Sequence, residues 1–347
     1  MRSRGNREES AERCSVRSPW NPDSGGVTGQ RIPKLEGQLL SRRYRKPPRV
    51  DPIPKDVQGE KVTNSFRLNK VGVTGVVKPV QVRRPNRTVT LTTTLDLFVD
   101  LPPDQKGSHM SRNLEAINEV VDRSVREPVD SLEELTETIA RSLLKRHEYA
   151  TTSEVWAEAD YFLERTSPSG RTSLEPYRLV ARANARRGAA DVERSIGVEV
   201  VGMTACPCAM ETVRDDVMKE HPELTRWPEG VPIITHNQRN RTTAILQEPP
   251  GHEIEADELV DIVEESLSAP TFGLLKRPDE GRLVEMAHRN PKFVEDVVRE
   301  VLDRLLKRYP KMPDTAWVRV KSEAEESIHK HNAFAERSTT FGELRAL

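Results

Sequence analysis

The 347-residue chain is highly charged yet nearly neutral, with 54 Lys and Arg, 55 Asp and Glu and a formal net charge of −1 at pH 7. No apolar run approaches the roughly 20 residues that span a bilayer, and no apolar secretory segment follows the first Met, which excludes an integral membrane protein and argues against export. Only three cysteines occur, which argues against a disulfide-stabilised protein. We therefore expect a cytoplasmic protein that does not associate with membranes.

The N-terminal segment differs in charge from the rest of the chain. Residues 1–50 carry 12 Lys and Arg against 5 Asp and Glu, whereas the remaining residues carry 42 against 50. Low apolar content predicts that residues 1–60 form a disordered basic extension. Such a tail can bind nucleic acid, but the acidic remainder does not favour that alternative.

The pattern becomes regular from about residue 68. It predicts strand, strand, helix, helix, strand, strand, in this order: 68–82, 87–101, 111–127, 131–147, 153–166 and 171–186. Ser131 and Glu134 form the S-x-x-E signature that begins a helix. We assign residues 61–188 to a first structural unit.

The same order recurs over residues 189–347. Strands are predicted at 194–206 and 231–247, helices at 256–268 and 290–309, and a strand at 314–326. An insertion near 209–230 separates the first two strands. The expected fold class is α+β: tandem β-β-α-α-β-β units that form one antiparallel sheet with helices on one face.

Two of the three cysteines, Cys206 and Cys208, lie one residue apart in "GMTACPCAM". Pro207 stiffens the turn and a disulfide between such near neighbours would be strained. The spacing is also too short for a C-x₂₋₄-C zinc half-site. One thiolate is therefore the better ligand candidate, although two small buried cysteines would explain the pair equally well.

Three further polar clusters could supply metal ligands. "THNQRNR" places His236 in a strand-like segment, and "ESIHKHNAFAE" supplies His329 and His331. "LLKRPDE" contains Glu280, and we interpret this segment as a bend held by Pro278. A thiolate, imidazoles and a carboxylate form a set suited to Zn²⁺ or Fe²⁺. A core histidine and solvated loops are the alternatives. Separately, "GSHMSR" places His109 and Arg112 at a predicted helix start, where an anion is favoured but ordinary capping also suffices.

The motifs "SHMSR", "GMTACPCAM", "THNQR", "LLKRPDE", "NPKFVED" and "ESIHKHNAFAE", in that order, resemble the GTP cyclohydrolase family that comprises the second bacterial type and the archaeal MptA type. The resemblance covers roughly residues 68–342. It implies the tunnelling fold, which has two β-β-α-α-β-β units per subunit, and a homo-oligomer, either a dimer or a tetramer, with active sites at subunit interfaces.

The resemblance also implies roles for individual residues. It makes Cys206, His236, Glu280 and His329 the metal ligands, with His331 competing for the last place. Glu295 corresponds to the glutamate that anchors the guanine edge, and a carboxylate can indeed accept two hydrogen bonds from guanine.

Other residues are expected to act near the substrate. His109 and Arg112 match positions close to it, and we add Arg239 and Lys276 as phosphate contacts because of their charge and placement. His109 or the non-ligating histidine of the 329/331 pair would protonate the departing ring nitrogen. Cys208 would tune the neighbouring thiolate.

The wording of "GMTACPCA" and the long stretch after it are closer to the archaeal type. This implies one Fe²⁺ per subunit, with Mn²⁺ or Zn²⁺ as alternatives, and hydrolysis of GTP at C8 to formate, diphosphate and 7,8-dihydroneopterin 2′,3′-cyclic phosphate, the first step toward methanopterin-type pterins. The alternatives are the bacterial type, which gives 7,8-dihydroneopterin triphosphate, and a non-catalytic metal-stabilised binding protein.

Overall fold

The structure is a computed structural model that describes residues 57–60, 62–84, 87–228 and 230–346. The basic extension expected over residues 1–60 lies outside this range except for 57–60. The first half of the described chain has the expected order of elements: β1 (Leu68–Arg84), β2 (Arg87–Leu101), α1 (Met110–Arg126), α2 (Leu132–Arg146), β3 (Thr152–Thr166) and β4 (Thr172–Arg186). Helix α2 begins as predicted, because the Glu134 N–H donates to Ser131 Oγ at 3.1 Å.

The second half repeats this order with additions. Its elements are β5 (Glu193–Ala205), α3 (Pro207–Glu220), β6 (Asn237–Glu248), α4 (Ala256–Ser266), β7 (Ala269–Pro270), α5 (Arg277–Arg289), α6 (Val294–Arg308), β8 (Trp317–Glu325), β9 (Ala333–Thr340) and α7 (Phe341–Arg345). Helix α3 lies in the expected insertion between β5 and β6.

Several elements differ from the sequence prediction, and the short β7 and α7 were not predicted. The strand predicted from residue 231 begins only at Asn237, and Pro232 in the excluded part has no N–H to donate to a sheet. Helix α5 begins in a segment interpreted as a bend, because Pro278 is tolerated in the first helical turn. Strand β9 was not predicted, since it lies at the sheet edge and buries few apolar side chains.

All the strands belong to one antiparallel sheet, ordered β1-β2-β3-β4-β5-β6-β8-β9, with the short β7 beside β5. The pairing register aligns one buried apolar row across six strands: Leu95, Ala157, Ala181, Ile196, Leu246 and Val318. Side chains alternate between the two faces of a strand. The next row therefore faces the other way, and it includes Glu158 and Arg319.

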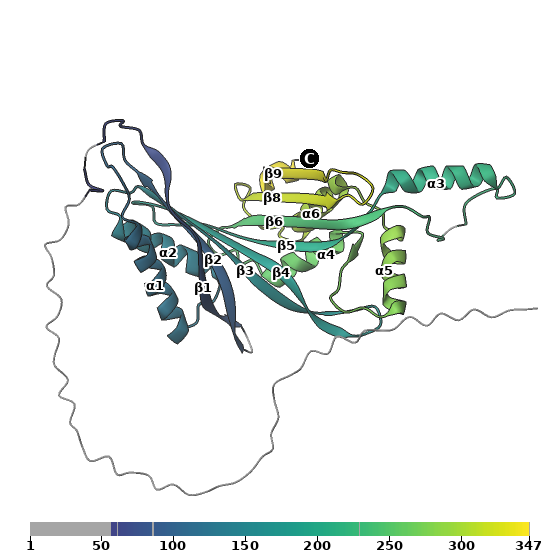
Figure 1. The fold of residues 1–347 in the computed structure, drawn as a ribbon, viewed down its shortest axis with the longest axis horizontal. Helices are drawn as coiled ribbons and strands as arrows, with labels where there is room; N and C mark the ends of the chain where they lie inside the picture. The colour runs from purple at the N-terminus through teal and green to yellow at the C-terminus, as the bar shows by residue number, and fades with distance from the viewer. Residues whose placement is uncertain (1–56, 61, 85–86, 229, 347) are drawn as a thin grey trace, which may run out of the picture. The chain divides into compact units, whose positions relative to one another are not determined.

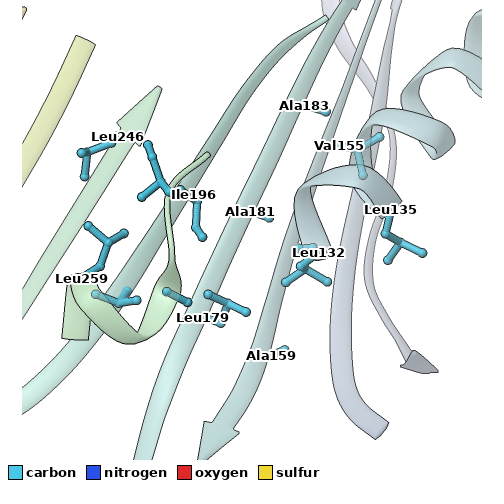
Figure 2. Close-up of a cluster of buried hydrophobic side chains, with 14 of the residues drawn as sticks. Leu132, Leu135, Val155, Ala159, Leu179, Ala181, Ala183, Ile196, Leu246 and Leu259 are labelled. Carbon is cyan, nitrogen blue, oxygen red and sulfur yellow. The ribbon is translucent and has the colours of Figure 1, made fainter. Parts of the chain in front are cut away.

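Helices cover the apolar face. Helix α2 packs on β3 and β4, α4 on β5, and α6 on β8 and β9, and the ribbon shows these helices along the strands (Figure 1). Figure 2 shows Leu132 and Leu135 of α2 on the side of Val155 and Ala181. It shows Leu259 of α4 on the side of Ile196 and Leu246. Fully burying one such leucine contributes about 1.5–3 kcal/mol. The expected α+β class, with helices on one face of an antiparallel sheet, is confirmed.

In the described part of the chain, no helix is long and apolar enough to cross a membrane.

Candidate metal and substrate site

Cys206 and His236 are neighbours because strands β5 and β6 pair up to their ends. The last paired residues are Ala205 and Asn237. The Cys206 N–H then donates to the His236 carbonyl at 3.0 Å, which extends the ladder by one step. Thirty residues of sequence separate the two side chains, yet the register places them together at one end of the sheet.

A hollow of about 340 Å³ opens beside this pair, here called the Cys206 hollow. It contains five of the residues that the sequence analysis selected: Cys206, His236, Glu295, His329 and His331. The remaining lining residues include Gln238, Lys292 and Glu326.

The three histidines of the hollow lie next to one another in series. The His236 and His329 ring centroids lie 6.3 Å apart, nearly perpendicular, and His329 and His331 are stacked at 5.2 Å. Consecutive imidazoles at this spacing offer several nitrogen atoms to a single ligand or metal ion.

Gln238 decides which nitrogen of His236 carries the proton. His236 Nδ1 lies 3.0 Å from Gln238 Oε1, which can only accept, so Nδ1 is the protonated nitrogen. The Gln238 amide is itself oriented by Thr204, since its Nε2 donates to Thr204 Oγ1 at 3.3 Å. His236 Nε2 is thereby left with a lone pair for a metal ion, the arrangement that metal-binding histidines commonly have.

Glu326 is a functional candidate that the sequence analysis did not select. Its Oε2 lies 3.7 Å from His236 Nδ1, and the two side chains are only 10% and 12% exposed. It follows β8 directly and begins the quoted "ESIHKH" segment, so its proximity to the histidines was a usable signal. A second carboxylate beside His236 adds negative charge that favours a cation in the hollow.

Lys292 holds the segment that carries Glu295. Its backbone N–H donates to the Ala205 carbonyl at 3.0 Å, directly before Cys206. Its ammonium is buried and bonds to the Ser266 carbonyl at 3.0 Å and to Glu300 at 2.5 Å. These contacts position the start of α6, so Glu295 in its first turn reaches the rim of the hollow.

The remaining predicted residues do not line the Cys206 hollow in the described part of the chain. Glu280 and Lys276 are exposed at the start of α5, and Arg239 is exposed on β6. Cys208 is exposed in the first turn of α3.

His109 and Arg112 begin α1, where Arg112 donates to the Arg146 carbonyl at 3.0 Å. They too lie apart from the hollow.

The donor chemistry of the hollow suits a divalent metal ion, although the described residues do not by themselves enclose one. Cys206 supplies a thiol, and His236 offers an Nε2 lone pair. Among the described residues, however, no three His, Cys, Asp or Glu side chains converge closely enough to enclose a metal. Cys206 and His236 can therefore supply only part of a four-ligand coordination shell.

Comparisons with known proteins identify a family and individual proteins to which this chain is similar. The model of the family described as "Type I GTP cyclohydrolase folE2" matches residues 55–335. GTP cyclohydrolase MptA of Methanosarcina acetivorans is 44% identical over 305 residues, which cover 84% of this chain and 96% of the relative. GTP cyclohydrolase MptA of Methanothermobacter thermautotrophicus is 42% identical over 300 residues, with 84% and 94% covered.

Among solved structures, uricase from Arthrobacter globiformis aligns with a TM-score of 0.44 at 10% identity, covering 78% of this chain and 93% of the uricase.

Proposed function

Because the chain belongs to the type I GTP cyclohydrolase folE2 family, we propose that the Cys206 hollow is where it hydrolyses GTP. The chain is a GTP cyclohydrolase of pterin biosynthesis, and its relatives named MptA place it with the archaeal type. The bacterial-type product and the non-catalytic binding protein are not favoured.

The observation that carries the site assignment is the pairing of Cys206 with His236, whose Nδ1–H is directed to Gln238. A thiol beside an imidazole with a free Nε2 is an arrangement for holding a metal ion. Glu295 shares the same hollow. Metal ligand and guanine anchor thus lie within reach of a single bound nucleotide.

We propose Fe²⁺ as the metal, one per subunit, with Mn²⁺ or Zn²⁺ as the alternatives. Cys206 and His236 would hold it together with Glu280 and one of His329 and His331. When bound, the metal would supply Lewis-acid activation of water for attack at C8 of the purine.

The chain's own residues would orient the substrate and move protons. The Glu295 carboxylate can accept hydrogen bonds from the guanine N1–H and its amino group. The exposed rings of Phe293 and Phe334 on the hollow rim can stack on the base. Whichever of His329 and His331 does not hold the metal would give a proton to the departing ring nitrogen, as His109 could from a neighbouring subunit.

The proposed products are formate, diphosphate and 7,8-dihydroneopterin 2′,3′-cyclic phosphate. We further propose that two or four subunits assemble with shared active sites. Such an assembly would explain why four predicted residues lie outside the hollow of one subunit: Glu280, Lys276, Arg112 and Arg239. Cys208, at the start of α3, would tune the neighbouring Cys206 thiolate. We propose that the protein works in the cytoplasm, because this compartment supplies GTP and keeps cysteines reduced.

The deciding experiment is anaerobic incubation of the protein with Fe²⁺ and GTP, with products read by mass spectrometry. Formate, diphosphate and the cyclic phosphate are expected. Dihydroneopterin triphosphate would overturn the proposed product while keeping the enzyme class. Absence of any pterin with Fe²⁺, Mn²⁺ and Zn²⁺ would overturn the site assignment.

A further inference from the structure

A second cavity, of about 460 Å³, lies where α2 and α4 begin, and we call it the α2–α4 cavity. Its walls come from the β1–β2 pair, the 130–134 segment, β4, β5 and the 248–256 segment after β6. It shares no lining residue with the Cys206 hollow. The proposed reaction assigns it no role.

The cavity contains a carboxylate with an unused acceptor. Glu133 is only 3% exposed, and within the described residues its Oε1 has no hydrogen-bond partner. A buried carboxylate oxygen left without a donor costs about 1–3 kcal/mol. A ligand that carries a donor to this atom would remove that cost.

Glu248 lies in the same cavity, where it accepts a hydrogen bond from the Ile254 N–H and shares the charge of a guanidinium. It is 9% exposed, and its Oε2 lies 3.1 Å from Arg194. The same guanidinium also pairs with Glu137 at 3.3 Å. One Arg194 charge is therefore divided between two carboxylates.

The walls carry more negative than positive charge. Two guanidiniums, Arg84 and Arg194, face six carboxylates: Asp130, Glu133, Glu134, Glu248, Glu253 and Glu255. Asp130 is paired outward with Arg83 at 2.7 Å, and Glu134 accepts the Asp130 N–H at 2.9 Å. Glu133, which keeps a hydrogen bond to Ser131, and Glu248 are thus the inner carboxylates, and neither has a guanidinium to itself among the described residues.

The positive ends of the α2 and α4 helix dipoles favour an anion in the cavity, but their effect is weaker than that of the carboxylates. Each helix N-terminus is equivalent to about half a positive charge. The first turns of α2 and α4 already place acidic residues there, Glu133 and Glu134 in one and Asp257 and Glu258 in the other. The net preference of the cavity is for a cation.

An apolar wall accompanies the carboxylates. Leu132, Leu179, Ile196, Ile254 and Ala256 line the cavity and are buried, and Figure 2 shows Leu132, Leu179 and Ile196 close to one another. A hydrated inorganic cation gains nothing from such a wall, whereas an alkyl chain gains about 0.8 kcal/mol per buried CH₂.

We propose that the α2–α4 cavity binds an aliphatic primary amine, with the ammonium group between Glu133 and Glu248 and the carbon chain on the apolar wall. Three ammonium protons match the free Glu133 Oε1 and the half-compensated Glu248. The inference does not depend on the proposed reaction.

The titration of Glu248 supports this assignment and makes it measurable. Burial, reinforced by the nearby charges of Glu133 and Glu253 and opposed by Arg194, raises the pKa of Glu248 to about 7. Burial likewise raises the pKa of Glu133. An ammonium ion favours the ionised forms, so binding should strengthen as pH rises and should release protons.

The test is isothermal titration of butylamine into the full-length protein at pH 6, 7 and 8. One site per chain is expected, with affinity about tenfold higher at pH 8 than at pH 6 for a coupled group of pKa about 7. Titration in buffers of different ionisation enthalpy should show proton release at pH 7. Butanol and butyrate, which lack the positive charge, and K⁺, which lacks the carbon chain, should bind at least tenfold more weakly.

Substitutions of single carboxylates test whether Glu133 and Glu248 bind the amine. Glu133→Gln should weaken butylamine at least tenfold without changing GTP turnover, whereas Glu148→Gln, an exposed control beyond the other end of α2, should bind normally. If Glu133→Gln does not fold by circular dichroism, Glu248→Gln replaces it and should abolish the pH dependence. Absence of binding, pH-independent binding, or equal affinity for K⁺ or butanol would each overturn the proposal.

Discussion

Replacing Gln238 with Leu tests whether the orientation of His236 prepares the metal site. The change removes the acceptor of the His236 Nδ1 proton and the donor to Thr204 Oγ1, bonds of 3.0 and 3.3 Å. Gln238 is only 8% exposed, so water does not easily replace the lost carbonyl. His236 is then free to rotate or to exchange its proton between the two nitrogens.

The expected loss of metal affinity is 10- to 100-fold, the usual consequence of removing the outer hydrogen bond of a metal-binding histidine. This corresponds to about 1.4–2.7 kcal/mol. The free energy of unfolding of the metal-free protein should fall by only about 1 kcal/mol for each lost bond. Metal binding should therefore suffer more than folding.

The assay is competition for Fe²⁺ against a chelator under anaerobic conditions, alongside chemical unfolding of the metal-free protein. Gln247→Leu is the matched control, because it removes one acceptor, that of the Trp317 N–H, from the same strand. It should leave metal affinity unchanged. If Gln238→Leu binds Fe²⁺ as tightly as the control does, the tautomer reasoning is wrong.

Four further predictions concern the same fold and site. Cys206→Ala should lose both the metal and GTP turnover, and stoichiometric metal in the purified variant would contradict its role as a ligand. Glu295→Ala should keep the metal but lose turnover by at least 100-fold, which metal analysis and a formate assay measure together; normal turnover would refute the guanine anchor. Gly197→Ala should destabilise the protein by about 1–3 kcal/mol in urea unfolding, since its Cβ would lie 2.6 Å from the Ala244 carbonyl oxygen; an unchanged midpoint would refute that contact. Burial alone would raise the pKa of Asp100, but hydrogen bonds from Thr152, Thr151 and Arg67 outweigh it and lower the pKa to about 2. The carboxylate therefore contributes about 2 kcal/mol to the free energy of unfolding above pH 4, and this contribution is lost as the pH falls toward 2. Asp100→Asn should make the free energy of unfolding less dependent on pH over that interval.

Local patterns predicted most of the fold. Alternation of apolar and polar residues marked the long strands, and the Ser131–Glu134 signature marked the start of α2. Strand β9 was not predicted, because an edge strand buries few side chains and so shows little alternation of apolar and polar residues. Helix α5 was not predicted, because Pro278 was interpreted as a bend, although proline is tolerated in the first turn of a helix.

The site was predictable as a set of residues and not as an arrangement. Cys206, His236, Glu295, His329 and His331 were all selected from sequence segments, and the structure gathers them around one hollow. Gln238 and Lys292 were missed, because their importance comes from hydrogen bonds to strand ends that no linear spacing reveals.

The sequence by itself determined the α+β class, the repeated order of elements and the chemical types of the site residues, because these depend on local periodicity and composition. Only the tertiary structure decided that Cys206 meets His236, that Gln238 orients the imidazole, and that Glu133 and Glu248 share a separate cavity. The physical reason is that strand register and helix packing join residues tens to more than a hundred positions apart, and these contacts depend on how the whole sheet is assembled.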